Sequence, residues 1–227
     1  MKRIVLTLGL VALTGALFTT TASAKTNICE DESSLCTSVQ TDSVTGKGVC
    51  VIDGATIDGG LTVTGDCLLK DVTVNGGIKM NAAGKTLQAC GSTINGGVRV
   101  SNASCVTLGV GSDTDVPTSP CDSTGDSITG GVQVTNLSGG ATDCFAAADA
   151  SFESEGSTIT GGLQLTNTAF GEVQLESDVV SGGVQINNNN SALDVTGNTI
   201  MGVLQCAGNA GPFNISGNSV TGVTNCD

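Results

Sequence analysis

The sequence predicts an all-β protein, a single-domain parallel β-solenoid of about eight coils, and three observations support this prediction. A Gly-Gly pair recurs about every 20 residues, apolar residues fill fixed columns on both sides of it, and ten cysteines are spread through the repeats. Strands of about three to five residues at this period cannot bury a core as isolated hairpins, whereas turns of chain that stack on one another can.

The Gly-Gly pair aligns the repeats. It occurs at 59–60, 76–77, 96–97, 130–131, 161–162 and 182–183, and Gly202-Val203 and Gly222-Val223 continue the series. The residues two before, two after and four after the first glycine are mostly apolar, as in Ile128, Val132 and Val134. The residue between the last two is mostly polar, and this alternation is the period of a β-strand. The glycines fit a corner where the backbone bends or takes a positive φ.

An array of helical repeats is the alternative architecture. No window of the sequence places apolar residues at helical spacing, while β-branched residues and glycine are frequent throughout. The stacked columns of residues 50–227 resemble those of secreted right-handed parallel β-helix proteins. The stretch 202–209, followed by 217–220, is also similar to repeats in small uncharacterised bacterial secreted proteins. Such a resemblance implies a fold and does not by itself transmit a function.

The first 24 residues have the features of a secretory signal peptide. Lys2 and Arg3 precede an apolar stretch, and Ala22-Ser23-Ala24 supplies a cleavage site. The predicted location is therefore secreted, at the cell surface, in the extracellular space or in the periplasm, with no stable membrane insertion after processing. We expect residues 25–49 to form an N-terminal cap and residues 50–227 the solenoid. Two long repeat intervals indicate loop insertions near 109–123 and 139–155.

The ten cysteines predict disulfides, because an even number in an exported chain is typical of an oxidising compartment. Cys206 and Cys226 share one column in successive coils, as do Cys50 and Cys67, so each pair should lie about 4.8 Å apart. Cys29 and Cys36 are expected to close a loop in the cap. The sequence leaves open how Cys90, Cys105, Cys121 and Cys144 pair. No C-x-x-C spacing suggests a metal site.

Function in a solenoid lies on its exposed columns, and one of these is rich in amides. Three residues after the first glycine stand, among others, Gln133, Gln164, Gln185 and Gln205, and six after it stand Asn102, Asn136, Asn167 and Asn188. Stacked amides hydrogen-bond along a ladder, so the Asn column is expected to hold the coils together. The Gln column is a candidate surface for polysaccharide or for a partner, although the scarcity of aromatic residues weighs against sugar binding.

A second exposed surface carries hydroxyl groups. Ranks of Thr and Ser stand three residues and one residue before the first glycine, and they resemble the T-x-T arrays of ice-binding solenoids. Thr158 and Thr160 match that motif in full, whereas Asp58, Asn75 and Met201 interrupt the second rank. The alternative interpretation is an ordinary solvated β-face, because threonine is a good strand residue.

The sequence contains few residues in patterns that suit catalysis. The chain has no histidine, so a Ser-His-Asp triad, a Cys-His pair and an imidazole-bound metal are excluded. A net charge of −13 and 2% aromatic residues argue against nucleic acid as a partner. Acids such as Asp113, Glu153 and Asp178 are scattered and are interpreted as solvated. We predict no catalytic residues, no metal and no cofactor.

The leading functional hypothesis is a non-catalytic structural or surface protein of the envelope or extracellular matrix. Near Asp227 the sequence shows no obvious cap, so strand edges at that end are expected to invite end-to-end stacking into a homo-oligomer or filament. The alternative is a binding module for polysaccharide or ice that uses the Thr, Asn and Gln ladders. A carbohydrate-active enzyme with a cleft between the two insertions, using Asp113 or Glu153, ranks third.

Overall fold

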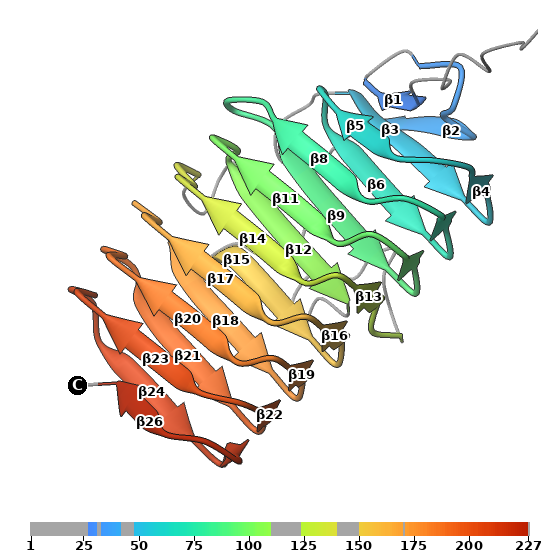
Figure 1. Ribbon diagram of the computed structural model, residues 1–227. Coiled ribbons are helices and arrows are strands. Elements are labelled where there is room, and N and C mark those ends of the chain that lie inside the picture. The colour runs from blue at the N-terminus through green and yellow to red at the C-terminus, as the bar shows by residue number, and fades with distance from the viewer. Residues whose placement is uncertain are drawn as a thin grey trace, which may run out of the picture.

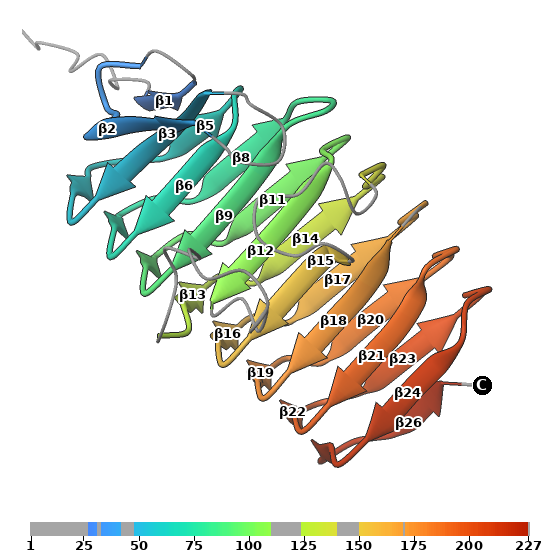
Figure 2. The same cartoon turned by 180° about the vertical axis from the view of Figure 1, so that it is seen from behind.

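The protein is a stack of short strands wound into three parallel sheets, as the computed structural model shows (Figures 1 and 2). The structure describes residues 27–30, 33–41, 48–109, 124–139, 150–169 and 171–226. Within these ranges the chain forms strands and no helix. The predicted all-β solenoid of about eight coils, with a period near 20 residues, is therefore confirmed.

Each sheet collects one strand from every coil. Sheet A contains β1 (Asn27–Cys29), β5 (Leu61–Val63), β8 (Ile78–Asn81), β11 (Val98–Ser101), β14 (Val132–Thr135), β17 (Leu163–Thr166), β20 (Val184–Asn187), β23 (Leu204–Ala207) and β26 (Thr224–Cys226). Sheet B contains β2 (Ser38–Thr41), β3 (Gly48–Asp53), β6 (Cys67–Lys70), β9 (Thr86–Cys90), β12 (Cys105–Gly109), β15 (Ala150–Glu155), β18 (Glu172–Glu176), β21 (Ala192–Thr196) and β24 (Phe213–Ser216). Sheet C contains β4 (Thr56–Ile57), β7 (Thr73–Val74), β10 (Thr93–Ile94), β13 (Ser127–Thr129), β16 (Thr158–Thr160), β19 (Val179–Ser181), β22 (Thr199–Met201) and β25 (Ser219–Val220).

One coil runs from sheet B through sheet C to sheet A, and the next coil stacks on it in register. Ile128 pairs with Ile159, and Val134 pairs with Leu165, so residues of one sequence column are neighbours along the stack. Inward side chains of all three sheets, including Phe152 and Ile159, are fully buried in one core that runs along the stack. The apolar columns aligned on the glycine pair are thus the walls of this core.

The glycine pair forms the corner between sheets C and A, where coils meet backbone to backbone. Gly131 has φ +78°, and a Cβ there would lie 2.8 Å from the carbonyl oxygens of Gly161 and Gly162 in the next coil. A side chain would therefore meet both an unfavourable backbone conformation and a backbone clash. This close approach explains why glycine recurs at the corner.

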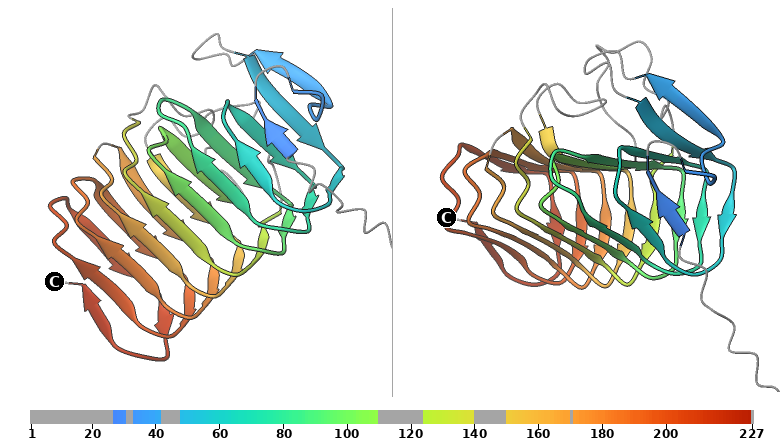
Figure 3. Two further views of the ribbon diagram at one scale, coloured as in Figure 1. Left: turned by 45° about the horizontal axis from the view of Figure 1, so that its top comes forward. Right: turned by 90° about the horizontal axis from the view of Figure 1, so that it is seen from above.

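Two strands from the predicted cap segment lie at the N-terminal end of the stack (Figure 3). β1 continues sheet A by pairing with β5 in parallel, whereas β2 pairs with β3 in the antiparallel direction. Residues 1–26, which include the predicted signal peptide, lie outside the described residues.

The disulfides correct two predicted pairings. Cys206 and Cys226 are bonded, as expected. At the other end Cys29 is bonded to Cys67, and Cys36 to Cys50, so the predicted pairs Cys29–Cys36 and Cys50–Cys67 are wrong.

Cys50 and Cys67 do stack in register, as the shared column predicts. However, Cys29 at the end of β1 and Cys36, two residues before β2, lie against this column, and each stacked cysteine bonds to one of them. Cys90 and Cys105 are also disulfide-bonded, while Cys121 and Cys144 lie outside the described residues.

The second predicted insertion is shorter than expected. Residues 150–155, placed in the insertion near 139–155, form strand β15 of sheet B and pair with β12 and β18. A register shift between Ala150 and Phe152 at the start of β15 breaks the regular period there, which hid the strand in the sequence. The rest of both insertions, 110–123 and 140–149, lies outside the described residues.

Candidate functional site

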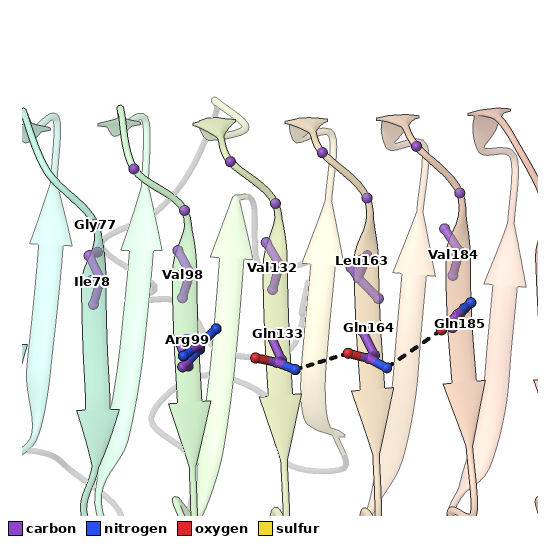
Figure 4. A pocket seen from close by; sticks show the side chains of 18 of the residues that line it. Gly77, Ile78, Val98, Arg99, Val132, Gln133, Leu163, Gln164, Val184 and Gln185 are labelled. Carbon is purple, nitrogen blue, oxygen red and sulfur yellow. Dashed lines mark hydrogen bonds between the residues drawn. The ribbon is translucent and has the colours of Figure 1, made fainter.

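A long groove follows the glycine corner on the outside of sheet A (Figure 4). It has a volume of about 870 Å³ and passes the glycine corners of six successive coils, from Gly77 to Val203. Glycine backbone forms its floor because no side chain fills the corner. The first two residues of the sheet A strands, such as Val132 and Gln133, form its side.

The predicted Gln column lies along this groove. The side-chain amide nitrogen of Gln133 donates to Oε1 of Gln164 at 3.0 Å, and that of Gln164 donates to Oε1 of Gln185 at 3.5 Å (Figure 4). Gln205 follows in register on β23. We call Gln133, Gln164 and Gln185 the Gln ladder. Each amide carries two N–H donors, so the ladder retains hydrogen-bonding capacity toward the groove.

Two cations continue the same column toward the N-terminal end. Arg99 pairs in register with Lys79 on one side and with Gln133 on the other, and both cations are exposed and line the groove. The groove thus has a cationic end and an amide-lined end. Lys79 and Arg99 also stand three residues after the first glycine of their repeats, but this spacing does not reveal the groove, because a groove depends on the missing side chains of the corner.

The hydroxyl ranks lie on sheet C, across the glycine corner from the Gln ladder. Thr158 and Thr160 are exposed on β16, and Ser127 and Val179 flank Thr158 in register. At the N-terminal end of this face the rank becomes an amide chain, in which Asn95 donates to Asn75 and Asn75 donates to Asp58. The structure therefore places the two predicted surfaces side by side and keeps them on different sheets.

The Asn column forms a ladder at the corner between sheets A and B. Asn167 donates to Asn136, and Asn136 donates to Asn102, each at 3.1 Å. Asn102, Asn136, Asn167 and Asn188 all have φ between +55° and +60°, a conformation that asparagine tolerates better than most residues. The recurrence of asparagine in one column predicts the ladder, but it does not by itself reveal that these positions need a left-handed backbone.

Asn136 provides a test of these two roles. Asn136→Ala is expected to lower the free energy of unfolding by about 1–2 kcal/mol, because it loses the exposed hydrogen bonds and keeps the left-handed backbone. Asn136→Gly should lose less than half of that stability, since glycine adopts this backbone freely. The chain itself has a glycine in this column: Ala207 is the register partner of Asn187, so Gly208, with φ +67°, stands one coil after Asn188. Urea unfolding with the disulfides intact measures the free energy of unfolding of both variants. Equal losses would show that the backbone conformation contributes nothing.

A third, internal polar column runs along the corner between sheets B and C, and sequence analysis missed it. In each coil, the backbone N–H of one residue in this column donates to the side-chain oxygen of the residue in the next coil. The donor–acceptor pairs are Val72 to Ser92, Ser92 to Asp126, Asp126 to Ser157, Ser157 to Asp178, Asp178 to Asn198, and Asn198 to Asn218. We call the six accepting side chains the corner column. The position four residues before the first glycine of the corner could have revealed it, since from Ser92 onward it is always Ser, Asp or Asn, and all of these except Asp178 follow a glycine.

Two carboxyl groups in the corner column are buried and have raised pKa values. Burial raises the pKa of Asp126 to about 7, although N–H donors of Ser92 and Gly109 oppose the shift. Burial likewise raises the pKa of Asp178 to about 7, and the Ser157 N–H and the Ser154 hydroxyl oppose it. The interpretation of Asp178 and Glu153 as solvated acids is therefore wrong, because both are buried. Asp113 lies outside the described residues.

The outer face of sheet B carries further acids. Glu155 and Glu176 pair in register, and the pKa of each is raised, first by burial and then by repulsion from neighbouring carboxylates. In the described part of the chain, no three Cys, Asp or Glu side chains are arranged to hold a metal ion.

Comparison with other proteins provides no relative. No protein-family model, no curated protein and no solved structure matches this chain. Among the described residues there is also no helix of sufficient length and apolar character to cross a membrane. A functional assignment must therefore rest on the groove, the ladders and the ends of the stack.

Proposed function

We propose that this is a secreted, non-catalytic structural protein of the cell envelope or extracellular matrix that self-associates through the last coil of its solenoid. The observation that carries the proposal is an uncharged open edge. Strands β24, β25 and β26 are the last strands of their sheets, and residues 195–226 contain no charged side chain. Disulfides agree with an oxidising, extracellular environment.

Such an edge is of the kind that proteins usually protect. Natural edge strands carry charges, especially lysine, or are covered, because their unpaired backbone groups pair with other chains. Here the last coil instead exposes large apolar side chains, with Phe213 42% and Val223 66% accessible. Like-charge repulsion, which opposes association elsewhere on a chain of net charge −13, is weak at this end, where Asp227 is the one acid in residues 195–227.

Charging this edge tests the proposal. The double variant Ser219→Lys/Asn225→Lys places lysines on outward positions of β25 and β26, and we expect it to stay monomeric at concentrations where the native protein associates. Thr158→Lys/Gln164→Lys puts the same charges in the same two columns on interior strands, and should associate as the native protein does. Sedimentation velocity across a concentration series, with negative-stain electron microscopy, measures both. A native protein that remains monomeric throughout would refute self-association.

A second candidate function is a binding module, and the groove favours it. The groove is longer than a small-molecule pocket requires, and an amide ladder runs along it. A polysaccharide or other linear polymer would suit that shape, in line with the alternative drawn from the sequence.

A further inference from the structure

We propose that the groove binds a linear polysaccharide that carries acidic groups, with Lys79 and Arg99 contacting the acidic groups and the Gln ladder contacting hydroxyls. This inference rests on the second candidate function, the binding module, and adds the chemical class of its ligand. It is independent of self-association through the last coil.

The cation pair is the first argument. Lys79 and Arg99 stand in register on adjacent strands β8 and β11, about 4.8 Å apart, so their like charges repel each other. Neither makes an ion pair with a described residue, whereas Lys85, in the same part of the chain, contacts Asp66 at 3.0 Å. An anion lying across both side chains would remove the repulsion, and the groove leaves room for it.

The shape of the groove is the second argument. Six coils at about 4.8 Å give a trough of roughly 24 Å, which suits an extended chain rather than a compact ligand. The glycine floor allows a flat ring to approach the backbone closely. Beyond the cations, the Gln ladder presents neutral donors and acceptors, which match the hydroxyl groups of a sugar chain.

Two other linear polymers fit less well. A peptide usually binds by adding a strand to a free sheet edge, but the strands along this groove already pair on both sides. A nucleic acid requires many cations and aromatic platforms for its bases, and this groove offers two cations and no aromatic residue.

The acids of the described residues lie mainly away from the cation pair. Glu155, Glu176 and Asp194 are on sheet B, a different face from the groove. Asp58, which directly follows β4 one coil before Lys79, accepts a hydrogen bond from Asn75. The net charge of −13 still repels a polyanion at long range, so we expect modest affinity that depends on the local cations.

Calorimetric titration with three polymers of one linear backbone tests the inference. Carboxymethylcellulose and cellulose sulfate supply carboxylate and sulfate groups, and hydroxyethylcellulose is the neutral control. At one ionic strength we expect at least one acidic polymer to bind about tenfold more tightly than the neutral one. Comparing carboxymethylcellulose with cellulose sulfate shows whether the groove prefers carboxylate or sulfate groups. Lys79→Gln/Arg99→Gln should reduce acidic binding to the neutral level.

The chain itself offers matched controls. The Gln substitutions extend the native Gln column, so the fold should be kept, which thermal unfolding verifies. Lys70→Gln removes a cation from sheet B, away from the groove, and should leave the affinity for every polymer unchanged. Conversely, Gln133→Arg adds a third cation beside Arg99 and should raise the ratio of acidic to neutral affinity several-fold, while the neutral polymer reports the loss of the Gln133 amide from the ladder.

The outcomes separate the two hypotheses. If no polymer binds, both the inference and the candidate binding function fail. If the neutral polymer binds as tightly as the acidic ones, or if the charge variants change nothing, the binding function stands and the inference is overturned. Should the double Gln variant fail to fold, Gln133→Arg alone decides, because an unchanged ratio of acidic to neutral affinity in that variant overturns the inference.

Discussion

Replacing Gly131 with alanine is expected to lower the free energy of unfolding by about 3 kcal/mol or more. Two effects combine. The residue has φ +78°, which costs an L-residue about 1–2 kcal/mol, and its Cβ would lie 2.8 Å from two backbone carbonyl oxygens of the next coil. Backbone atoms cannot rotate aside as a side chain can, so the clash adds about 1–3 kcal/mol of strain.

Gly156→Ala separates the clash from the backbone strain. Gly156 also has a positive φ, +65°, but a Cβ there would meet nothing within 4 Å. We expect a loss of about 1 kcal/mol for this variant, attributable to the left-handed conformation alone. Denaturant unfolding with the disulfides intact measures both variants. Similar losses for the two would show that the coils can separate at the glycine corner without cost.

The sequence was sufficient for the architecture because each coil contributes to the same core. Residues such as Val134 and Leu165 recur in one column since stacking makes them neighbours, so periodicity in sequence becomes adjacency in space. The same logic located the Gln ladder and the Asn ladder. It also explains why Cys206 and Cys226, in one column of two regular coils, were paired correctly.

Prediction was less successful where the repeat is interrupted or where contacts cross between columns. At the N-terminal end, Cys67 is bonded to Cys29 on another sheet, a contact that no single column contains. Strand β15 follows an insertion and a register shift, so its period was lost. The groove was missed for a different reason: it arises from side chains that are absent, and only the packed corner shows what space they leave.

The buried acids show how local register decides chemistry. The side-chain amide nitrogen of Asn198 donates to the carbonyl oxygen of Leu175, and that of Asn218 donates to the carbonyl of Val195. Asp178 stands one coil before Asn198 in the same column. Ser154 is the register partner of Leu175, so Ser154 stands to Asp178 as Leu175 stands to Asn198. Oδ2 of Asp178 is buried and accepts no hydrogen bond of good geometry, in the place where its neighbours have a donor, although the Ser154 hydroxyl is close enough to oppose the rise in pKa. The protonated acid, which can donate, is therefore the form that fits.

This leads to a pH dependence of stability. Burial raises the pKa of Asp178 to about 7, opposed by the Ser157 N–H and the Ser154 hydroxyl and helped by the negative charges of Glu155 and Asp126, whereas an unfolded aspartate has a pKa near 3.9. Between these values the folded protein binds a proton that the unfolded chain does not, so stability decreases as the pH rises from about 4 to 7 and then levels off. We expect a higher thermal midpoint at pH 5 than at pH 8.

Asp178→Asn should remove this residue's share of the dependence. At pH 8 it replaces a buried charge by the amide that the column already uses at Asn198, so the thermal midpoint should rise by several degrees. At pH 5 the native side chain is largely protonated, so the variant should differ little. Differential scanning calorimetry at both values measures the contrast, and a midpoint at pH 8 no higher than that of the native protein would contradict it.

Asp126→Asn is the matched control, and it should act in the opposite direction. Asp126 has a similarly raised pKa, but both of its oxygens accept backbone donors, Ser92 N–H at 2.8 Å and Gly109 N–H at 2.9 Å. An amide has one acceptor oxygen, so its NH₂ would face one of these N–H groups and leave it unsatisfied, at a cost of about 1–3 kcal/mol. We expect a loss of stability at both pH values. Two aspartates of one column and similar pKa would then respond oppositely to the same substitution, because hydrogen-bond partners, and not burial alone, decide which form of the side chain the fold accepts.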